Sequence, residues 1–275
     1  MYKLIACDVD GTLIDERFVL SRLDIDAVAK AREKGIVFAL CSGRSYRSLR
    51  VYARDLGVAN EGDFIIGFNG GLIYDPHNDR VVKKEELDKG VGVELVRFYK
   101  NSDINMEIVV YFDGEGSLVE KNSEYAGIYH KTSRADWFEA EDIVAAASEL
   151  KSIAKIIFIG DNSDLQAFEK ELTASHLRDE AEIFFSSRYL LEAVPKGCDK
   201  AGGVQWLCER LGIEMAEVIA IGDNYNDLGM IKAAGLGVAV ANAVKPAKEI
   251  ADYVTVRDCA NGAVAEVIEK FILGL

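Results

Sequence analysis

The sequence predicts an α/β protein, a doubly wound parallel-sheet core that is interrupted by an inserted α+β domain. At both ends of the chain, short apolar runs alternate with segments of helical periodicity, as parallel strands and their crossover helices do. In the middle, strand-like runs follow one another closely, which is typical of antiparallel pairing. We therefore expect a core at residues 1–83 and 190–275 and an insert at residues 84–189.

The N-terminal arm has a β-α-β-α-β order, which predicts a parallel sheet covered on both faces. Its expected elements are strands at 4–7, 36–41 and 64–66 and helices at 24–34 and 46–56. Ser21 and Asp24 have the spacing of a capping box at the start of the first helix. Gly57 stands where a left-handed residue would end the second helix.

The middle of the chain combines hairpins with helices, and this pattern defines the insert. Its expected elements are strands at 106–112, 117–121, 155–159, 182–185 and 189–194, and helices at 89–100 and 164–175. The run Asp113-Gly114-Glu115-Gly116 is a hairpin signal between the first two strands.

The C-terminal arm returns to strands alternating with helices. Its expected elements are helices at 200–211, 228–234, 245–251 and 262–271 and strands at 218–221, 236–240 and 253–256. We expect these strands to complete the parallel sheet of the N-terminal arm.

Composition excludes several classes of protein. With 275 residues and 49% hydrophobic residues the chain can bury a sizeable core, and its net charge of −14 argues against partners such as nucleic acid or an anionic membrane. Five cysteines without C-x-x-C spacing indicate neither a disulfide framework nor a zinc site. A reducing cytosol fits these cysteines, and we expect a cytoplasmic protein. No apolar run is long enough to span a bilayer. We also expect a monomer or weak homo-oligomer.

The first candidate site is the run Asp8-Val9-Asp10-Gly11-Thr12, which directly follows the first strand. Ligands of open parallel sheets bind beyond the carboxyl ends of the strands. Residues two apart in an extended chain face the same side, so Asp8 and Asp10 can point into one pocket. Two close carboxylates repel unless a cation or a donor lies between them. Taken alone, this run can also be a polar turn.

Two further candidate sites suit an anion. Ser42 and Gly43 follow the second strand, where a hydroxyl and backbone amides can bind an oxyanion, although a Ser-Gly turn before a helix is common. Lys196 and Lys200 precede or open a helix, where a lysine is unfavourable unless an anion is also present. We favour Lys200 because it opens the helix.

The fourth candidate site, Gly222-Asp223-Asn224-Tyr225-Asn226-Asp227, follows another buried strand. Asp223 and Asp227 are four residues apart and can lie on one face of a helix. Residues 157–162 repeat the apolar-Gly-Asp-Asn pattern inside the insert, but lack the later Asn-Asp pair. We interpret them as a strand followed by a helix N-cap.

Taken together, the four sites resemble those of the haloacid dehalogenase superfamily of phosphohydrolases, which has a Rossmann-like core. The nearest likeness is the Cof-type branch with its large type-IIB cap domain. The resemblance covers residues 1–83 and 190–275, and also includes the stretches 68–71 and 233–243. The motifs that carry it are Asp8–Thr12, Ser42–Arg44, Lys200 and Gly222–Asp227.

The resemblance implies a Mg²⁺-dependent phosphatase that acts on small phosphorylated metabolites through an aspartyl-phosphate. Asp8 would be the nucleophile and Asp10 the general acid and base. Mg²⁺ would be held by Asp8, by the backbone carbonyl of Asp10 and by Asp223, with Asp227 in support. The phosphate would be bound by Val9, Thr12, Ser42, Gly43, Lys200 and Asn226. The insert would be the cap that reads the leaving group, and Arg44 is one possible substrate contact.

Two alternatives stay open. A phosphomutase or phosphotransferase of the same superfamily would share Asp8 and the metal but pass the phosphoryl group to a hydroxyl other than water. A non-catalytic metabolite-binding regulator is the other, although intact Asp8, Asp10, Lys200 and Asp223 argue against it. A dehalogenase is disfavoured because a halide leaving group needs neither an acid nor Mg²⁺.

Overall fold

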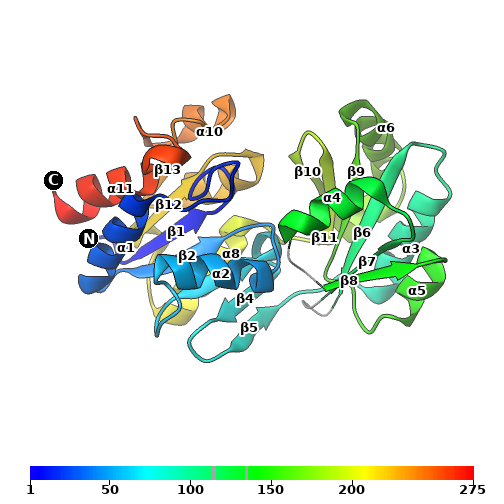
Figure 1. Ribbon diagram of the computed structural model, residues 1–275, viewed down its shortest axis with the longest axis horizontal. Helices are drawn as coiled ribbons and strands as arrows, with labels where there is room; N and C mark the ends of the chain where they lie inside the picture. Colours follow the sequence, from blue (N-terminus) through cyan, green and yellow to red (C-terminus); the bar gives the residue numbers. More distant parts are fainter. Residues whose placement is uncertain (113–115, 134–135) are drawn as a thin grey trace. The chain divides into compact units, whose positions relative to one another are not determined.

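The computed structural model describes residues 1–112, 116–133 and 136–275. It contains two compact units (Figure 1): a core unit of Met1–Lys83 with Asp199–Leu275, and an insert of Lys84–Cys198. The α/β fold class predicted from the sequence is confirmed. The insert ends at Cys198 rather than at residue 189, because the strand Leu190–Pro195 pairs on both sides with strands of the insert's own sheet.

The core unit is built on an eight-stranded sheet of order β14-β13-β12-β1-β2-β3-β4-β5. Six neighbouring strands are parallel, as the alternating pattern predicts, and β4 runs antiparallel to β3. The strands are β1 (Leu4–Asp8), β2 (Val37–Cys41), β3 (Phe64–Gly67), β4 (Leu72–Asp75), β5 (Arg80–Lys84), β12 (Val218–Gly222), β13 (Leu236–Ala239) and β14 (Tyr253–Val254).

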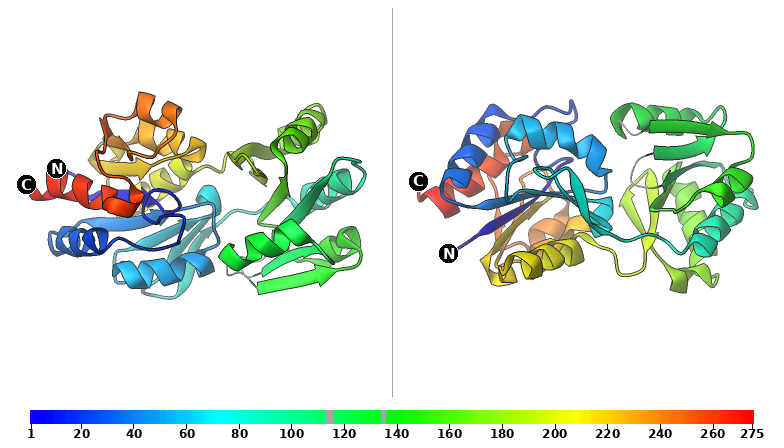
Figure 2. Two further views of the ribbon diagram at one scale, coloured as in Figure 1. Left: turned by 45° about the horizontal axis from the view of Figure 1, so that its top comes forward. Right: turned by 90° about the horizontal axis from the view of Figure 1, so that it is seen from below.

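Helices cover both faces of this sheet, and α2 and α8 lie on opposite sides of it (Figure 2). The helices are α1 (Arg22–Glu33), α2 (Tyr46–Leu56), α8 (Lys200–Leu211), α9 (Leu228–Ala233), α10 (Lys245–Ile250) and α11 (Ala263–Ile268), which continues as a π-helical turn Glu269–Leu273. Gly57 ends α2 with φ of 79°, as expected. The Ser21 hydroxyl caps α1 by accepting from the Leu23 amide at 3.3 Å, but the expected capping box with Asp24 is not formed, because Asp24 accepts from the Ala265 amide of α11 instead. Apolar side chains of α8 and α9 pack on one face of the sheet and bury it.

The insert has a six-stranded sheet of order β10-β11-β9-β6-β7-β8, antiparallel except between β7 and β8. Its strands are β6 (Met106–Phe112), β7 (Gly116–Glu120), β8 (Asp136–Ala140), β9 (Lys155–Gly160), β10 (Ala181–Ser187) and β11 (Leu190–Pro195). Its helices are α3 (Lys89–Lys100), α4 (Glu124–Ser133), α5 (Ile143–Glu149), α6 (Asn162–Thr173) and α7 (Leu177–Glu180). The β6–β7 pairing is the one expected, but residues 113–115 of its hairpin signal lie outside the described residues.

The insert has an apolar core of its own. Side chains from one face of its sheet, such as Ile108 and Phe158, pack there against α3, α5 and α6. Among the described residues, no helix combines the length and the apolar character needed to cross a bilayer.

Candidate active site

The parallel strands of the core unit bring the four candidate sites to one edge of its sheet. Asp8 is the last residue of β1 and pairs in register with Cys41, the last residue of β2, so Ser42 follows immediately beside it. On the other side of β1, β12 ends at Gly222 and is followed by Asp223. The carboxyl ends of parallel strands share an edge, so motifs that are far apart in the sequence meet there.

Three carboxylates, those of Asp8, Asp223 and Asp227, lie close together at this edge. We call them the acid cluster. Each offers one oxygen, and these oxygens lie within 4.8 Å of one another. The Lys200 ammonium donates to Asp8 Oδ1 and to Asp227 Oδ1, both at 2.6 Å. Lys200 is the first residue of α8, and its side chain is 1% exposed. A buried cation therefore bridges two of the three acids.

Burial and mutual repulsion dominate the electrostatics of the acid cluster. Burial, and next the charge of Asp227, raise the pKa of Asp8 well above its ordinary value, although Lys200 acts in the opposite direction. The same causes raise the pKa of Asp223 to about 7. Burial disfavours the charged form of Lys200, but Asp227 and Asp8 outweigh it and raise its pKa. One lysine thus leaves the cluster with more negative charge than it can neutralise.

The acid cluster fits a divalent cation with oxygen ligands. Asp8 Oδ2 is buried and has no hydrogen-bond partner among the described residues. Both oxygens of Asp227 are engaged, since Oδ1 accepts from Lys200 and Oδ2 accepts from the amides of Asp223 and Asn224, each at 3.0 Å. Asp8 and Asp223 are therefore the acids suited to contact a cation, and Asp227 supports them. Carboxylate oxygens are the ligands that Mg²⁺ prefers.

The turn after β1 fits closely around Asp223. Gly11 has φ of 83°, and a Cβ at this position would lie 2.6 Å from Asp223 Oδ2, so the turn requires glycine. The Thr12 hydroxyl, expected to face a phosphate, donates to Asp223 Oδ1 at 3.2 Å. The Asn242 amide donates to the Gly11 carbonyl at 2.6 Å. Thr12 and Asn242 therefore hold the turn and the acid together.

The loop after β2 is linked to the motif that follows β12 through Asn69, which lies in the turn after β3. The Asn69 amide nitrogen of the backbone donates to the Ser42 carbonyl at 3.0 Å, and its side-chain oxygen accepts from Asn226 Nδ2 at 3.1 Å. A Cβ on Gly43 would lie 3.1 Å from Asn69 Nδ2, which explains a glycine there. Ser42, Gly43 and Asn226 are thus joined through Asn69, which is 1% exposed.

Arg44 contacts a carboxylate of the protein itself. Its Nε donates to Asp10 Oδ2 at 2.7 Å, and its Nη2 donates to Asp10 Oδ1 at 2.5 Å. The sequence offered Arg44 as a possible substrate contact and did not connect it with Asp10. Residues 34 positions apart in different turns cannot be paired from the sequence alone.

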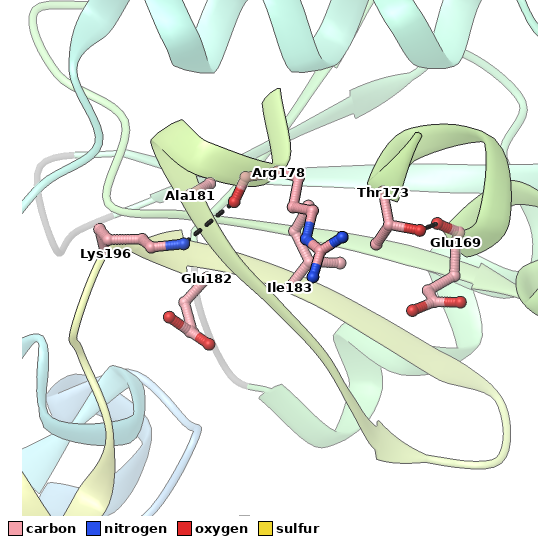
Figure 3. Close-up of a pocket in the computed structure, with 7 residues that line it drawn as sticks. All are labelled: Glu169, Thr173, Arg178, Ala181, Glu182, Ile183 and Lys196. Carbon is pink, nitrogen blue, oxygen red and sulfur yellow. Dashed lines mark hydrogen bonds between the residues drawn. The ribbon is translucent and has the colours of Figure 1, made fainter. Parts of the chain in front are cut away.

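The two competing motifs lie elsewhere, within the insert or at its end. Lys196 donates to the Arg178 carbonyl at 3.0 Å beside a cavity of about 410 Å³ (Figure 3). That cavity is lined by Glu169, Thr173, Arg178, Ala181, Glu182, Ile183 and Lys196. Asp161 is the N-cap residue of α6, as expected of residues 157–162, but its side chain makes no capping hydrogen bond.

Two residues at this edge, Asn69 and Asn242, were not predicted from the sequence to be part of the site. Both lie in stretches that resemble the family, 68–71 and 233–243, which was the available signal. Asn69 has φ of 53°, a left-handed conformation that asparagine tolerates better than most residues. Asn242 links the Gly11 carbonyl to the Cys259 amide, from which its Oδ1 accepts at 3.0 Å.

Comparisons with known proteins give matches over nearly the whole chain. A family model described as haloacid dehalogenase-like hydrolase matches residues 5–268. YxeH of Bacillus subtilis is 32% identical over 276 residues, which cover 99% of each chain. The B. subtilis protein named 5-amino-6-(5-phospho-D-ribitylamino)uracil phosphatase YcsE is 29% identical over 271 residues, 98% of this chain and 96% of that one. The crystal structure of a haloacid dehalogenase-like hydrolase from Bacteroides thetaiotaomicron superposes with a TM-score of 0.88 at 33% identity, covering 99% of this chain and 100% of that one.

Proposed function

Because this chain belongs to the haloacid dehalogenase-like hydrolases and is a phosphatase, we propose that it hydrolyses small phosphomonoesters, such as sugar phosphates, with Mg²⁺. The reaction proceeds through an aspartyl-phosphate on Asp8. The observation that carries the proposal is the acid cluster, bridged by Lys200, with one buried oxygen on Asp8 that has no partner in the described part of the chain. The name of YcsE, which specifies a phosphate on a ribityl chain, supports this substrate class.

The ligands assigned to the metal are Asp8, the backbone carbonyl of Asp10 and Asp223, and Asp227 supports them through Lys200 and the Asp223 amide. When bound, Mg²⁺ offsets the negative charge of the acids and of the phosphate and polarises a phosphoryl oxygen. Thr12 keeps Asp223 oriented through its hydroxyl, so we assign it to the acid rather than to the phosphate. Burial and then repulsion from Asp227 raise the pKa of Asp223, and a bound cation would favour its charged form.

In the first step a carboxylate oxygen of Asp8 attacks phosphorus, and the bond from phosphorus to the ester oxygen breaks. Asp10 gives a proton to the leaving oxygen, which departs as an alcohol. In the second step water attacks phosphorus while Asp10 takes up its proton, and the bond to Asp8 breaks. Orthophosphate is released, and both aspartates return to their starting forms.

The transferring phosphoryl group requires donors around its oxygens. We assign this role to the Lys200 ammonium, the Ser42 hydroxyl, the amides of Val9 and Gly43, and the Asn226 side chain. Their connection through Asn69 and Asp227 supports the assignment, because it keeps donors from different loops in one arrangement. To the insert we assign the exclusion of water and the reading of the leaving group.

The test is hydrolysis of p-nitrophenyl phosphate with Mg²⁺, with EDTA, and by the Asp8→Asn variant. We expect activity with Mg²⁺, loss of it in EDTA, and a kcat lower by about 10³-fold or more in the variant, which has no nucleophile. Asp26→Asn, at an exposed acid of α1, is the matched control and keeps full activity. Equal rates for wild type and Asp8→Asn would refute the proposal, and isomer formation without orthophosphate release would indicate a mutase.

A further inference from the structure

We propose that Arg44 is a positioning residue that holds the Asp10 carboxylate in the orientation needed to protonate the leaving group. The inference rests on the proposed function and assigns a role that the motifs do not specify. Arg44 Nε and Nη2 donate to different oxygens of Asp10, at 2.7 and 2.5 Å. A two-point contact between guanidinium and carboxylate fixes the plane of the acid as well as its position.

Arg44 is the anchored partner of the pair. Its side chain is 12% exposed, whereas that of Asp10 is 42% exposed. Its guanidinium carbon lies 5.4 Å from the centre of the Phe18 ring and 5.9 Å from that of Tyr52. Aromatic faces attract a guanidinium and restrict its movement. An exposed acid on a glycine turn is thus held by a cation that is itself fixed by two rings.

The turn that carries Phe18 places its ring beside Arg44. Phe18 has φ of 61°, which is uncommon for a bulky residue, and is 40% exposed, so neither backbone preference nor burial explains its position. Asp15 holds the turn: its Oδ1 accepts from the amides of Arg17 at 2.9 Å and Val19 at 3.2 Å, and its carbonyl accepts from the Phe18 amide at 2.9 Å. The contact with Arg44 gives this strained, exposed aromatic a function.

The pairing leaves Asp10 able to act. A carboxylate has about four lone-pair sites, and Arg44 occupies one on each oxygen, so a site remains for the proton that goes to the leaving alcohol. The Nε and Nη2 donors of Arg44 point at Asp10, and this contact defines a role different from the substrate contact that the sequence suggested. The two roles predict different kinetics, since positioning an acid affects only substrates whose leaving group needs a proton.

The experiment compares phenyl phosphate, whose phenolate is a poor leaving group, with p-nitrophenyl phosphate, whose leaving group needs little protonation. We expect Arg44→Gln to lower kcat/KM for phenyl phosphate by ~10²-fold and for p-nitrophenyl phosphate by less than ~5-fold. Inhibition by orthophosphate stays unchanged, because no phosphate contact is removed. Arg44→Lys, with one-point contact, restores part of the phenyl phosphate activity. The matched control, Arg50→Gln, removes an exposed arginine of α2 that pairs with Asp79 and changes neither rate.

Two further variants test the same role of Arg44 in case the Arg44→Gln variant folds poorly. Phe18→Ala should produce the same leaving-group pattern at ~5-fold for phenyl phosphate. Asp10→Asn with Arg44→Gln should be no slower on phenyl phosphate than Asp10→Asn alone, since both changes remove one function. Equal losses on the two esters, or weaker phosphate inhibition, would overturn the inference alone. A wild type inactive on both esters would overturn the proposed function and the inference with it.

Discussion

Lys200 is the residue on which the acid cluster most depends. Its ammonium is the donor to both Asp8 Oδ1 and Asp227 Oδ1, and the three side chains are at most 6% exposed. Water therefore screens their repulsion only weakly. The position at the start of a helix is unfavourable for a lysine unless it faces anions, and here the anions belong to the protein.

Substitutions of the two lysines near the start of α8 should have opposite effects on activity and stability. Lys200→Ala leaves Asp8 and Asp227 facing each other without a cation, so we expect kcat to fall by ~10²-fold or more and the unfolding free energy by about 3 kcal/mol. Lys196→Ala removes an exposed side chain that donates to the Arg178 carbonyl, and both quantities should stay near wild type. Phosphatase kinetics and urea unfolding measure them. The reverse order would show that the phosphate-binding lysine is Lys196.

At this scale, residue chemistry was easier to predict than residue partners. The preference for Lys200 over Lys196 followed from helix electrostatics, which the sequence displays. That Thr12 donates to Asp223, and Arg44 to Asp10, depends on how two turns approach each other. A hydroxyl or guanidinium that precedes or follows a strand can reach several acceptors, and only the folded turns select one.

Among the elements, the turn after β1 determines how closely the acids approach. Gly11 has a left-handed backbone, and a Cβ there would clash with Asp223. Gly35, after α1, has almost the same φ of 81°, but a Cβ there would meet open space. Substituting each glycine by alanine therefore distinguishes two contributions to stability: the cost of a positive φ, which both variants have, and the cost of a clash with Asp223, which only the Gly11 variant has.

We predict that Gly35→Ala is destabilised by about 1 kcal/mol for the loss of glycine at positive φ, and that Gly11→Ala is destabilised by more, because its Cβ also clashes with Asp223. Only Gly11→Ala should displace Asp223 and raise the Mg²⁺ concentration for half-maximal activity, by ~10-fold. Thermal melting and a magnesium titration of phosphatase activity measure the two effects. If both variants respond alike to Mg²⁺, the turn does not set the geometry of Asp223.

Elements with strong periodicity were predicted best. The expected bounds of α2, α3 and α8 match those observed, because each has an apolar face and clear end signals. The strands β4, β5 and β8 were missed. The strand β4 is buried but has only four residues, whereas most residues of β5 and β8 are partly or fully exposed. Such strands form because a neighbouring strand supplies hydrogen bonds, and their own residues carry no signal from which this pairing could be predicted.

At the scale of the molecule, Asp24 joins the two arms of the core unit. It lies in α1, is 0% exposed, and its Oδ1 accepts from the Ala265 amide of α11 at 2.6 Å. Burial raises its pKa from 3.8 to about 7, against the opposing effects of the Ala265 hydrogen bond and of Arg257. Between these pH values the folded protein keeps a proton that the unfolded chain loses, so this contribution to stability is complete below about pH 4 and is lost as pH rises through 7.

We predict that Asp24→Asn removes this pH dependence. The wild type should lose on the order of 2–4 kcal/mol of unfolding free energy relative to the variant between pH 4 and pH 8. Urea unfolding of both proteins across that range measures the difference, in which the titration of the acid cluster cancels. Asp26→Asn, an exposed change two residues away, is the control and should follow the wild type. Parallel profiles for wild type and Asp24→Asn would contradict the prediction.

Strand pairing between distant segments decides where the insert ends. The strand at Leu190–Pro195 has a buried apolar pattern that suits either sheet, and its pairing with β9 and β10 assigns it to the insert. Pairing is a relation between distant segments, so sequence periodicity can predict a strand without predicting its sheet.

The sequence by itself determined the fold class, the strongly periodic elements and the family, and it predicted Asp8, Asp10, Lys200 and Asp223 as the chemically active set. These follow from local properties, namely apolar periodicity, end signals and acids at strand ends, which each segment carries within itself. Only the tertiary structure decided which oxygens are engaged: both oxygens of Asp227 accept hydrogen bonds, Asp8 Oδ2 has no partner within the described residues, and Arg44 donates to Asp10. Hydrogen bonds between loops depend on distances and directions that arise when the sheet aligns its carboxyl ends, and no single segment encodes them.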